Sequence, residues 1–112
     1  MDLFEVVIVP KALQQLDKYI EYIRYTLLNE EAAGNVWLDA LDTVSELESV
    51  AGSLHLCEHP VLHELGYRAK LFQRHDYVML YRIEGRTAYV EGIYHLLQDY
   101  ANIFMRDRVT QN

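Results

Sequence analysis

Arg68, Lys70 and Arg74 are the cations most able to act together, because all three lie within one short basic stretch. Arg68 and Lys70 are two positions apart in a run with strand composition. Side chains alternate along a β-strand, so these two would share one face with Cα atoms about 6.5–7 Å apart. Such a pair could bind consecutive phosphates of a nucleic acid. The alternative is an ordinary solvated face, and the spacing alone favours that alternative.

A second set of reactive side chains follows the last predicted strand and consists of His95, Asp99 and Tyr100. Histidine exchanges a proton near neutral pH and can act as a general acid or base. Tyrosine can donate a hydrogen bond or stack on a base. The alternative is a histidine held by a local hydrogen bond among packed tyrosines, and the residue types alone favour it.

Four possible metal ligands lie within nine residues of one segment: His55, Cys57, His59 and His63. Imidazole and thiolate groups suit zinc, and a structural or sensing zinc module is one interpretation. The spacing matches no standard zinc motif, however, and Pro60 stiffens the middle of the segment. We therefore predict a polar connecting loop over residues 53–63, with no metal and no cofactor.

The elements that must position these residues begin with a β-rich run, Leu3–Val9, which predicts a buried strand. Pro10 can then open a helix whose apolar residues recur every three or four positions as far as Leu27. Asn29 can cap a second helix that ends near Gly52. Two amphipathic helices with so short a connection predict an antiparallel hairpin.

The C-terminal half predicts three strands and a short helix. The strands are Tyr67–Phe72, Tyr77–Ile83 and Thr87–Tyr94, and the middle one is apolar enough to be central. A helix over Leu97–Met105 and a flexible tail over 106–112 follow. We predict one α+β domain over 1–112, in which the N-terminal strand and a three-stranded antiparallel meander form a four-stranded sheet with helices on one face.

Composition and charge limit the possible functions. Hydrophobic residues make up 51% of 112 residues, which is typical of a globular domain, and a single cysteine excludes an internal disulfide. The sequence shows neither a signal-peptide pattern nor an apolar run long enough to span a membrane, so we expect a cytoplasmic protein without a membrane partner. The net charge of −7 argues against non-specific binding to nucleic acid.

The charge is unevenly distributed between the two halves of the chain. Residues 1–63 contain three basic and eleven acidic residues, a net charge of −8, whereas residues 64–112 contain seven and six, a net charge of +1. We therefore expect any anionic partner to bind the C-terminal half, near Arg68 to Arg74.

Three ordered segments of the C-terminal half, Gly66–Leu71, Tyr77–Ile83 and Tyr89–His95, together with Asp99-Tyr100, resemble the RelE/ParE toxin superfamily. Members typically carry an arginine on the first strand, a Tyr-x-x-x-Tyr-Arg motif on the second and a histidine that ends the third. The helical hairpin is similar too, so the resemblance spans about residues 4–104. The matching residues here are Arg68, Tyr77, Tyr81, Arg82 and His95.

The resemblance implies a growth-inhibiting toxin of a bacterial type II toxin–antitoxin system, held inactive in a hetero-oligomer with its cognate antitoxin. RelE-like members cut mRNA on the ribosome, and ParE-like members inhibit DNA gyrase. Three residues are expected to bind a partner on this basis: Tyr81, Asp99 and Tyr100.

A RelE-like ribonuclease would use a base, an acid and cations that stabilise the developing charge. The candidates in this chain are Arg68, Lys70, Arg74 and His95. Val78 and Leu96, however, occupy two positions at which RelE-like members carry arginines. These departures favour ParE-like inhibition of gyrase without catalysis. The alternatives are the mRNA endonuclease and an attenuated member that only binds its antitoxin.

Overall fold

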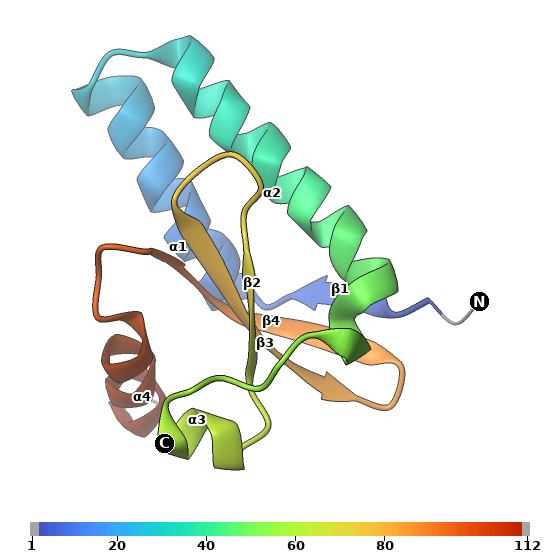
Figure 1. The fold of residues 1–112 in the computed structure, drawn as a ribbon. Helices are drawn as coiled ribbons and strands as arrows, with labels where there is room; N and C mark the ends of the chain where they lie inside the picture. Colours follow the sequence, from blue (N-terminus) through green and yellow to red (C-terminus); the bar gives the residue numbers. More distant parts are fainter. Residues whose placement is uncertain (1–2, 111–112) are drawn as a thin grey trace.

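The computed structural model describes residues 3–110, with the side chains of residues 3–108, and confirms the predicted α+β class (Figure 1). Strand β1 is followed by helix α1, a π-helical turn η1, the long helix α2 and a 3₁₀ turn η2. A short helix α3, the three strands β2, β3 and β4, and helix α4 complete the fold. The bounds are β1 Glu5–Ile8, α1 Pro10–Glu21, η1 Tyr22–Thr26, α2 Glu30–Val50, η2 Ala51–Ser53, α3 Pro60–Glu64, β2 Arg68–Leu71, β3 Tyr77–Glu84, β4 Thr87–His95 and α4 Tyr100–Thr110.

The helical hairpin forms where the apolar periodicity predicts it. Pro10 is at the start of α1, where a missing N–H costs little, and Leu16 and Ile20 are buried against the sheet. Asn29 caps α2, as predicted, because its side chain accepts a hydrogen bond from the backbone N–H of Ala32 at 2.9 Å. The first helix does not stay α-helical to Leu27, since its last turn is the π-helical η1.

The sheet has the strand order β1-β4-β3-β2. Strands β2, β3 and β4 form the predicted antiparallel meander, in which Gly85, with φ of +62°, turns the chain between paired Glu84 and Thr87. Strand β1 pairs in parallel with β4, since the hairpin carries the chain back across the sheet. Strand β3 is central, as expected from its apolar composition.

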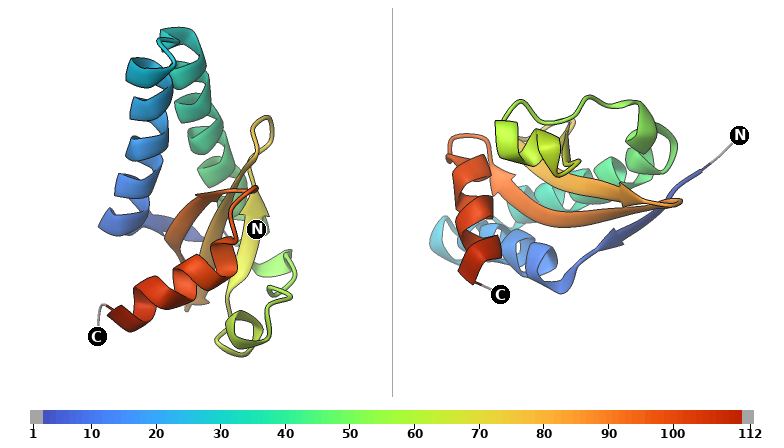
Figure 2. Two further views of the ribbon diagram at one scale, coloured as in Figure 1. Left: turned by 90° about the vertical axis from the view of Figure 1, so that its left-hand side faces the viewer. Right: turned by 90° about the horizontal axis from the view of Figure 1, so that it is seen from below.

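Helices cover both faces of the sheet, which corrects the prediction that they lie on one. Met79 and Tyr81 of β3 face the hairpin, whereas Val78 and Leu80 face a second core that includes Leu62 of α3. The reason is that β3 is apolar at successive positions, so both of its faces need cover. Figure 2 shows α1 and α3 on opposite sides of the sheet.

Two local predictions were wrong in their bounds. The segment predicted as a loop contains α3, which forms because Pro60 is at its first position and His59 caps it by accepting from the backbone N–H of Leu62. Helix α4 starts at Tyr100 rather than Leu97 and continues to Thr110, so much of the predicted tail is helical; residues 111–112 lie outside the described residues. No helix in the described residues has the length and apolar character needed to cross a membrane.

Candidate functional site

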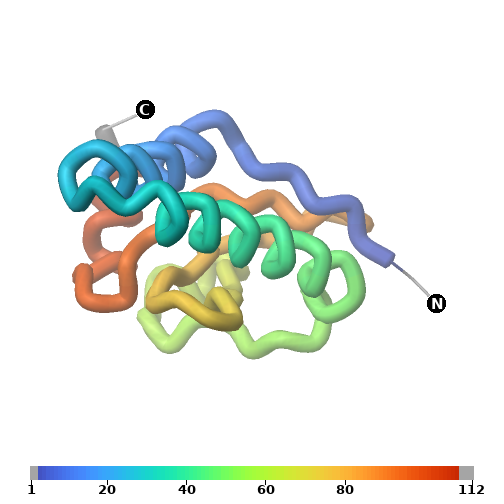
Figure 3. The backbone as a smooth tube through the Cα atoms, turned by 90° about the horizontal axis from the view of Figure 1, so that it is seen from above, coloured from blue at the N-terminus to red at the C-terminus, as the bar shows by residue number. Residues whose placement is uncertain are grey.

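The connection between β2 and β3 is held by one buried carboxylate, that of Asp39 on α2. Its two oxygens accept hydrogen bonds from the backbone N–H of Gln73 at 3.2 Å, the backbone N–H of Arg74 at 3.0 Å and Nδ1 of His75 at 2.7 Å. The Asp39 side chain is 0% exposed. Figure 3 shows this connection beside α2. Asp39 thus fixes the backbone at Gln73 and Arg74, and the imidazole of His75, against the hairpin.

Asp39 is ionised in this position. Burial alone would raise the pKa of its carboxyl, but the hydrogen bonds from His75, Arg74 and Gln73 and the Arg74 charge lower it below the ordinary value. A carboxylate can only accept hydrogen bonds, so Nδ1 of His75 must carry the proton that lies between the two side chains.

A cleft of about 400 Å³ opens between this connection and the hairpin. Its polar wall combines the β2–β3 connection with the end of β4, and its other wall belongs to η1 and the start of α2. The lining residues that bear on its chemistry are His75, His95, Arg74, Asp76, Ile23 and Val36. The topology brings them together because the paired residues Tyr77 and His95 place the start of β3 beside the end of β4.

His95 is fixed in orientation at the edge of this cleft. Its Nδ1 accepts a hydrogen bond from the backbone N–H of Leu97 at 3.1 Å, and its ring meets Tyr77 edge-on with centroids 5.1 Å apart. The His95 backbone N–H donates to the hydroxyl of Tyr19. Because Nδ1 accepts this hydrogen bond, the ring proton of His95 lies on Nε2.

The three cations of the basic stretch, Arg68, Lys70 and Arg74, all interact with neighbouring groups of the chain. Arg68 and Lys70 pair with the β3 residues Tyr81 and Met79, whose side chains face the hairpin. The guanidinium of Arg68 donates to the carbonyl of Leu54. Lys70 Nζ lies 3.3 Å from a carboxylate oxygen of Glu46 on α2.

Arg74 is engaged by α2 in the same way. Its guanidinium lies 2.5 Å from a carboxylate oxygen of Asp42 and 3.7 Å from Asp39. Carboxylates of the acidic hairpin therefore compensate the positive charges of the basic stretch, which lies about 30 residues later in the sequence.

The four residues predicted for ribonuclease chemistry do not share one cleft. Arg74 and His95 line the cleft described above, and Arg68 and Lys70 do not. The strand register explains the separation, because Arg68 pairs with Tyr81, four residues along β3 from the Tyr77–His95 pair. Val78, at a position where RelE-like members carry an arginine, is 0% exposed and belongs to the second core.

Of the three residues expected to bind a partner, Tyr81 is instead part of the core. It is 0% exposed, and its hydroxyl donates to the carbonyl of Ala51 at 2.7 Å. Burial raises the pKa of Tyr81 to about 12. Asp99 is exposed and accepts from the side-chain amide of Asn102, and Tyr100 is half-buried with its ring stacked on Tyr94. Asp99 and Tyr100 thus stay accessible at the start of α4.

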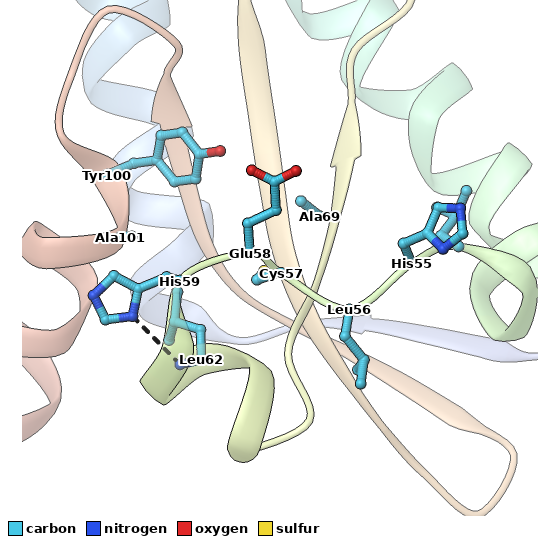
Figure 4. Close-up of a pocket in the computed structure, with 10 residues that line it drawn as sticks. His55, Leu56, Cys57, Glu58, His59, Leu62, Ala69, Tyr100 and Ala101 are labelled. Atoms are coloured by element: carbon cyan, nitrogen blue, oxygen red, sulfur yellow. Dashed lines mark hydrogen bonds between the residues drawn. The ribbon is translucent and has the colours of Figure 1, made fainter.

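The histidines of the 55–63 segment, for which a zinc module was the alternative interpretation, do not converge. His59 is engaged at both nitrogens, by the Leu62 backbone N–H and by Asn102, and Nδ1 of His63 bonds the Cys57 carbonyl at 3.2 Å. Figure 4 shows His55 and His59 at opposite ends of a separate cleft of about 390 Å³. Among residues 3–108, no group of three or more His, Cys, Asp or Glu side chains is placed to hold a metal ion. Burial raises the pKa of the Cys57 thiol, which disfavours its thiolate form.

Comparison with known proteins shows which solved structure has the same fold. No protein-family model and no curated protein matches the chain. A solved chain of the chromosomal ParDE toxin–antitoxin system from P. aeruginosa superposes with a TM-score of 0.70 over 86% of this chain and 99% of that chain, at 20% sequence identity. The two chains share one fold. The RelE/ParE resemblance predicted from the sequence is therefore confirmed at the level of the fold.

Asp39 and His75 are the site residues that sequence reasoning missed. Asp39 interrupts the apolar stripe of α2 between Val36 and Ala40, and that misplaced carboxylate was the available signal. Its partners lie more than 30 residues away, so the sequence alone does not pair them.

Proposed function

We propose that this chain is the toxin of a type II toxin–antitoxin system, of the ParE kind, which inhibits DNA gyrase by binding rather than by catalysis and is neutralised by a cognate antitoxin. The fold shared with a ParDE chain supports the type of system. The observation that carries the choice of mechanism is the pairing of Lys70 and Arg74 with α2 carboxylates.

That pairing bears directly on RNA cleavage. A cyclising cleavage places negative charge on the phosphate in its transition state, and removing charge-stabilising groups commonly costs orders of magnitude in rate. Here Glu46 and Asp42 already compensate Lys70 and Arg74, and Val78 supplies no charge. Inhibition by binding needs a complementary surface and no such cations, so it is compatible with this arrangement.

The hairpin offers a surface for a protein partner. Several of its apolar side chains are exposed, in particular around η1 and on the outer side of α2, and acidic residues such as Glu21, Glu30 and Asp42 are close to them in the sequence. An amphipathic antitoxin segment with basic residues would match both features. The exposed residues are Tyr22, Tyr25, Leu27, Leu28, Trp37, Leu38 and Leu41.

The test is induction of the chain alone in bacteria, followed by readouts of DNA damage and mRNA integrity. We expect growth arrest with a DNA-damage response, and inhibition of supercoiling when purified chain is added to purified gyrase. Lys70→Ala is the matched variant: it should keep full activity if gyrase is the target, because Glu46 and the Leu71 carbonyl already engage the Lys70 ammonium. Gyrase unaffected by a folded, growth-inhibiting chain would refute the proposal.

The second candidate is the RelE-like mRNA endonuclease, which the shared location of Arg74 and His95 in one cleft favours. Prompt mRNA cleavage after induction, lost in His95→Ala, would establish it in place of gyrase inhibition. Unimpaired growth, with tight binding to the product of a neighbouring antitoxin gene, would instead identify an attenuated member.

A further inference from the structure

The cleft between the hairpin and the β2–β3 connection has one apolar wall and one polar wall. Ile23, Leu27 and Val36 form the apolar wall, and His75 and His95 line the opposite one. At about 400 Å³ the cleft is large enough to admit a side chain of a partner, so its selectivity must come from the groups that line it.

The two histidines present opposite hydrogen-bonding groups. His95 accepts at Nδ1 from Leu97, so its Nε2 carries a proton and donates. The hydrogen bond from His75 Nδ1 to Asp39 selects the Nδ1–H tautomer of this imidazole, and in that tautomer Nε2 is an acceptor. Within residues 3–108, neither Nε2 atom forms a hydrogen bond to another protein group. The polar wall thus offers one donor and one acceptor that are both unused.

The charge around the cleft disfavours an anion. Arg74 is the cation on its wall, and Asp39 and Asp42 compensate it. Asp76 lines the same cleft and adds a further carboxylate. A cationic group would in turn oppose the donating Nε2 of His95. A neutral group that both donates and accepts is the one that the cleft matches.

We infer that this cleft binds a carboxamide, supplied by an Asn or Gln side chain of the antitoxin. The amide oxygen accepts from Nε2 of His95, the amide N–H donates to Nε2 of His75, and the attached methylene groups pack against Ile23 and Val36. The assignment of the carboxamide to the antitoxin rests on the proposed function, whereas the preference of the cleft for a carboxamide does not.

The test uses the full chain at pH 8, with imidazole carbon–proton NMR signals of His75 and His95 as readout and propionamide as probe. We expect saturable shifts of both signals. Propionate, which lacks donors and is charged, and N,N-dimethylpropionamide, which lacks the N–H groups, should bind about 3- to 10-fold more weakly, the factor typical of one lost hydrogen bond. Ethylamine should bind no better than these two.

Variants separate the cleft from other sites. His95→Phe keeps the aromatic contact with Tyr77 and should weaken propionamide binding by the same 3- to 10-fold, while His55→Phe, in the other cleft, should leave it unchanged. The inference is overturned if propionamide shifts neither histidine, if propionate binds as tightly, or if His55→Phe has the effect of His95→Phe. Each outcome is independent of gyrase inhibition, so a functional toxin with an unresponsive cleft would refute this inference alone.

Discussion

Replacing Asp39 with asparagine should destabilise the fold far more than its single atom change implies. One carboxylate oxygen accepts from Gln73, and the other accepts from both Arg74 and His75. An asparagine has one accepting oxygen, so its NH₂ group must face at least one of these donors in either orientation. A buried donor left unsatisfied costs roughly 1–3 kcal/mol, and a lost charged hydrogen bond about the same. We therefore expect a loss of about 3 kcal/mol in the free energy of unfolding.

The measurement is urea unfolding at pH 7, followed by circular dichroism. With an m value of about 1–3 kcal/mol/M, a loss of this size lowers the midpoint by about 1–3 M. The matched control is Asp42→Asn, which removes from the same helix another carboxylate that contacts Arg74. Its side chain is 54% exposed, so we expect a change below about 1 kcal/mol.

The pH dependence gives an independent check. Despite its burial, hydrogen bonds from His75 and the backbone lower the pKa of Asp39 in the fold. Its contribution is therefore fully present above the unfolded value of about 3.9 and is lost as pH falls through the lower folded value. The difference in free energy of unfolding between wild type and Asp39→Asn should narrow below about pH 4. The reasoning is refuted if the two Asp→Asn variants have equal midpoints at pH 7, or if the difference is as large at pH 3.

Three further predictions concern the core and the hairpin. Burial raises the pKa of Tyr67 and of Tyr81 to about 12, and for Tyr67 the hydrogen bond to Glu91 adds to this effect. The contribution of these two neutral hydroxyls to the free energy of unfolding is therefore complete below about pH 10 and is lost as pH rises through about 12. An absorbance titration at 295 nm should show late, unfolding-linked ionisation that Tyr81→Phe reduces; ionisation of every tyrosine near pH 10 in the folded chain would contradict this. Val78→Arg, which restores a RelE-like arginine, should unfold the chain or cost more than about 3 kcal/mol, since that position is 0% exposed; thermal melting measures it, and a variant as stable as the natural chain would contradict this. Asn29→Ala removes the α2 cap and should cost about 1 kcal/mol in urea unfolding, with no change contradicting the capping role.

Local patterns in the sequence determined the elements of this protein. The spacing of apolar residues predicted the helical hairpin, and Asn29 marked the start of α2. Gly85 marked the tight turn of the meander, and the apolar run from Tyr77 predicted a central strand. These features depend on interactions between residues a few positions apart, so the sequence carries them directly.

The tertiary structure decided what the reactive residues do. The sequence indicated a basic strand beside an acidic hairpin, but only the folded chain places Glu46 on Lys70 and Asp42 on Arg74 and so removes the excess positive charge. It also buries Asp39 beneath His75. The physical reason is the same in each case: a charge interacts with whatever the fold brings within a few ångströms, and those partners lie 24 to 36 residues away in the chain.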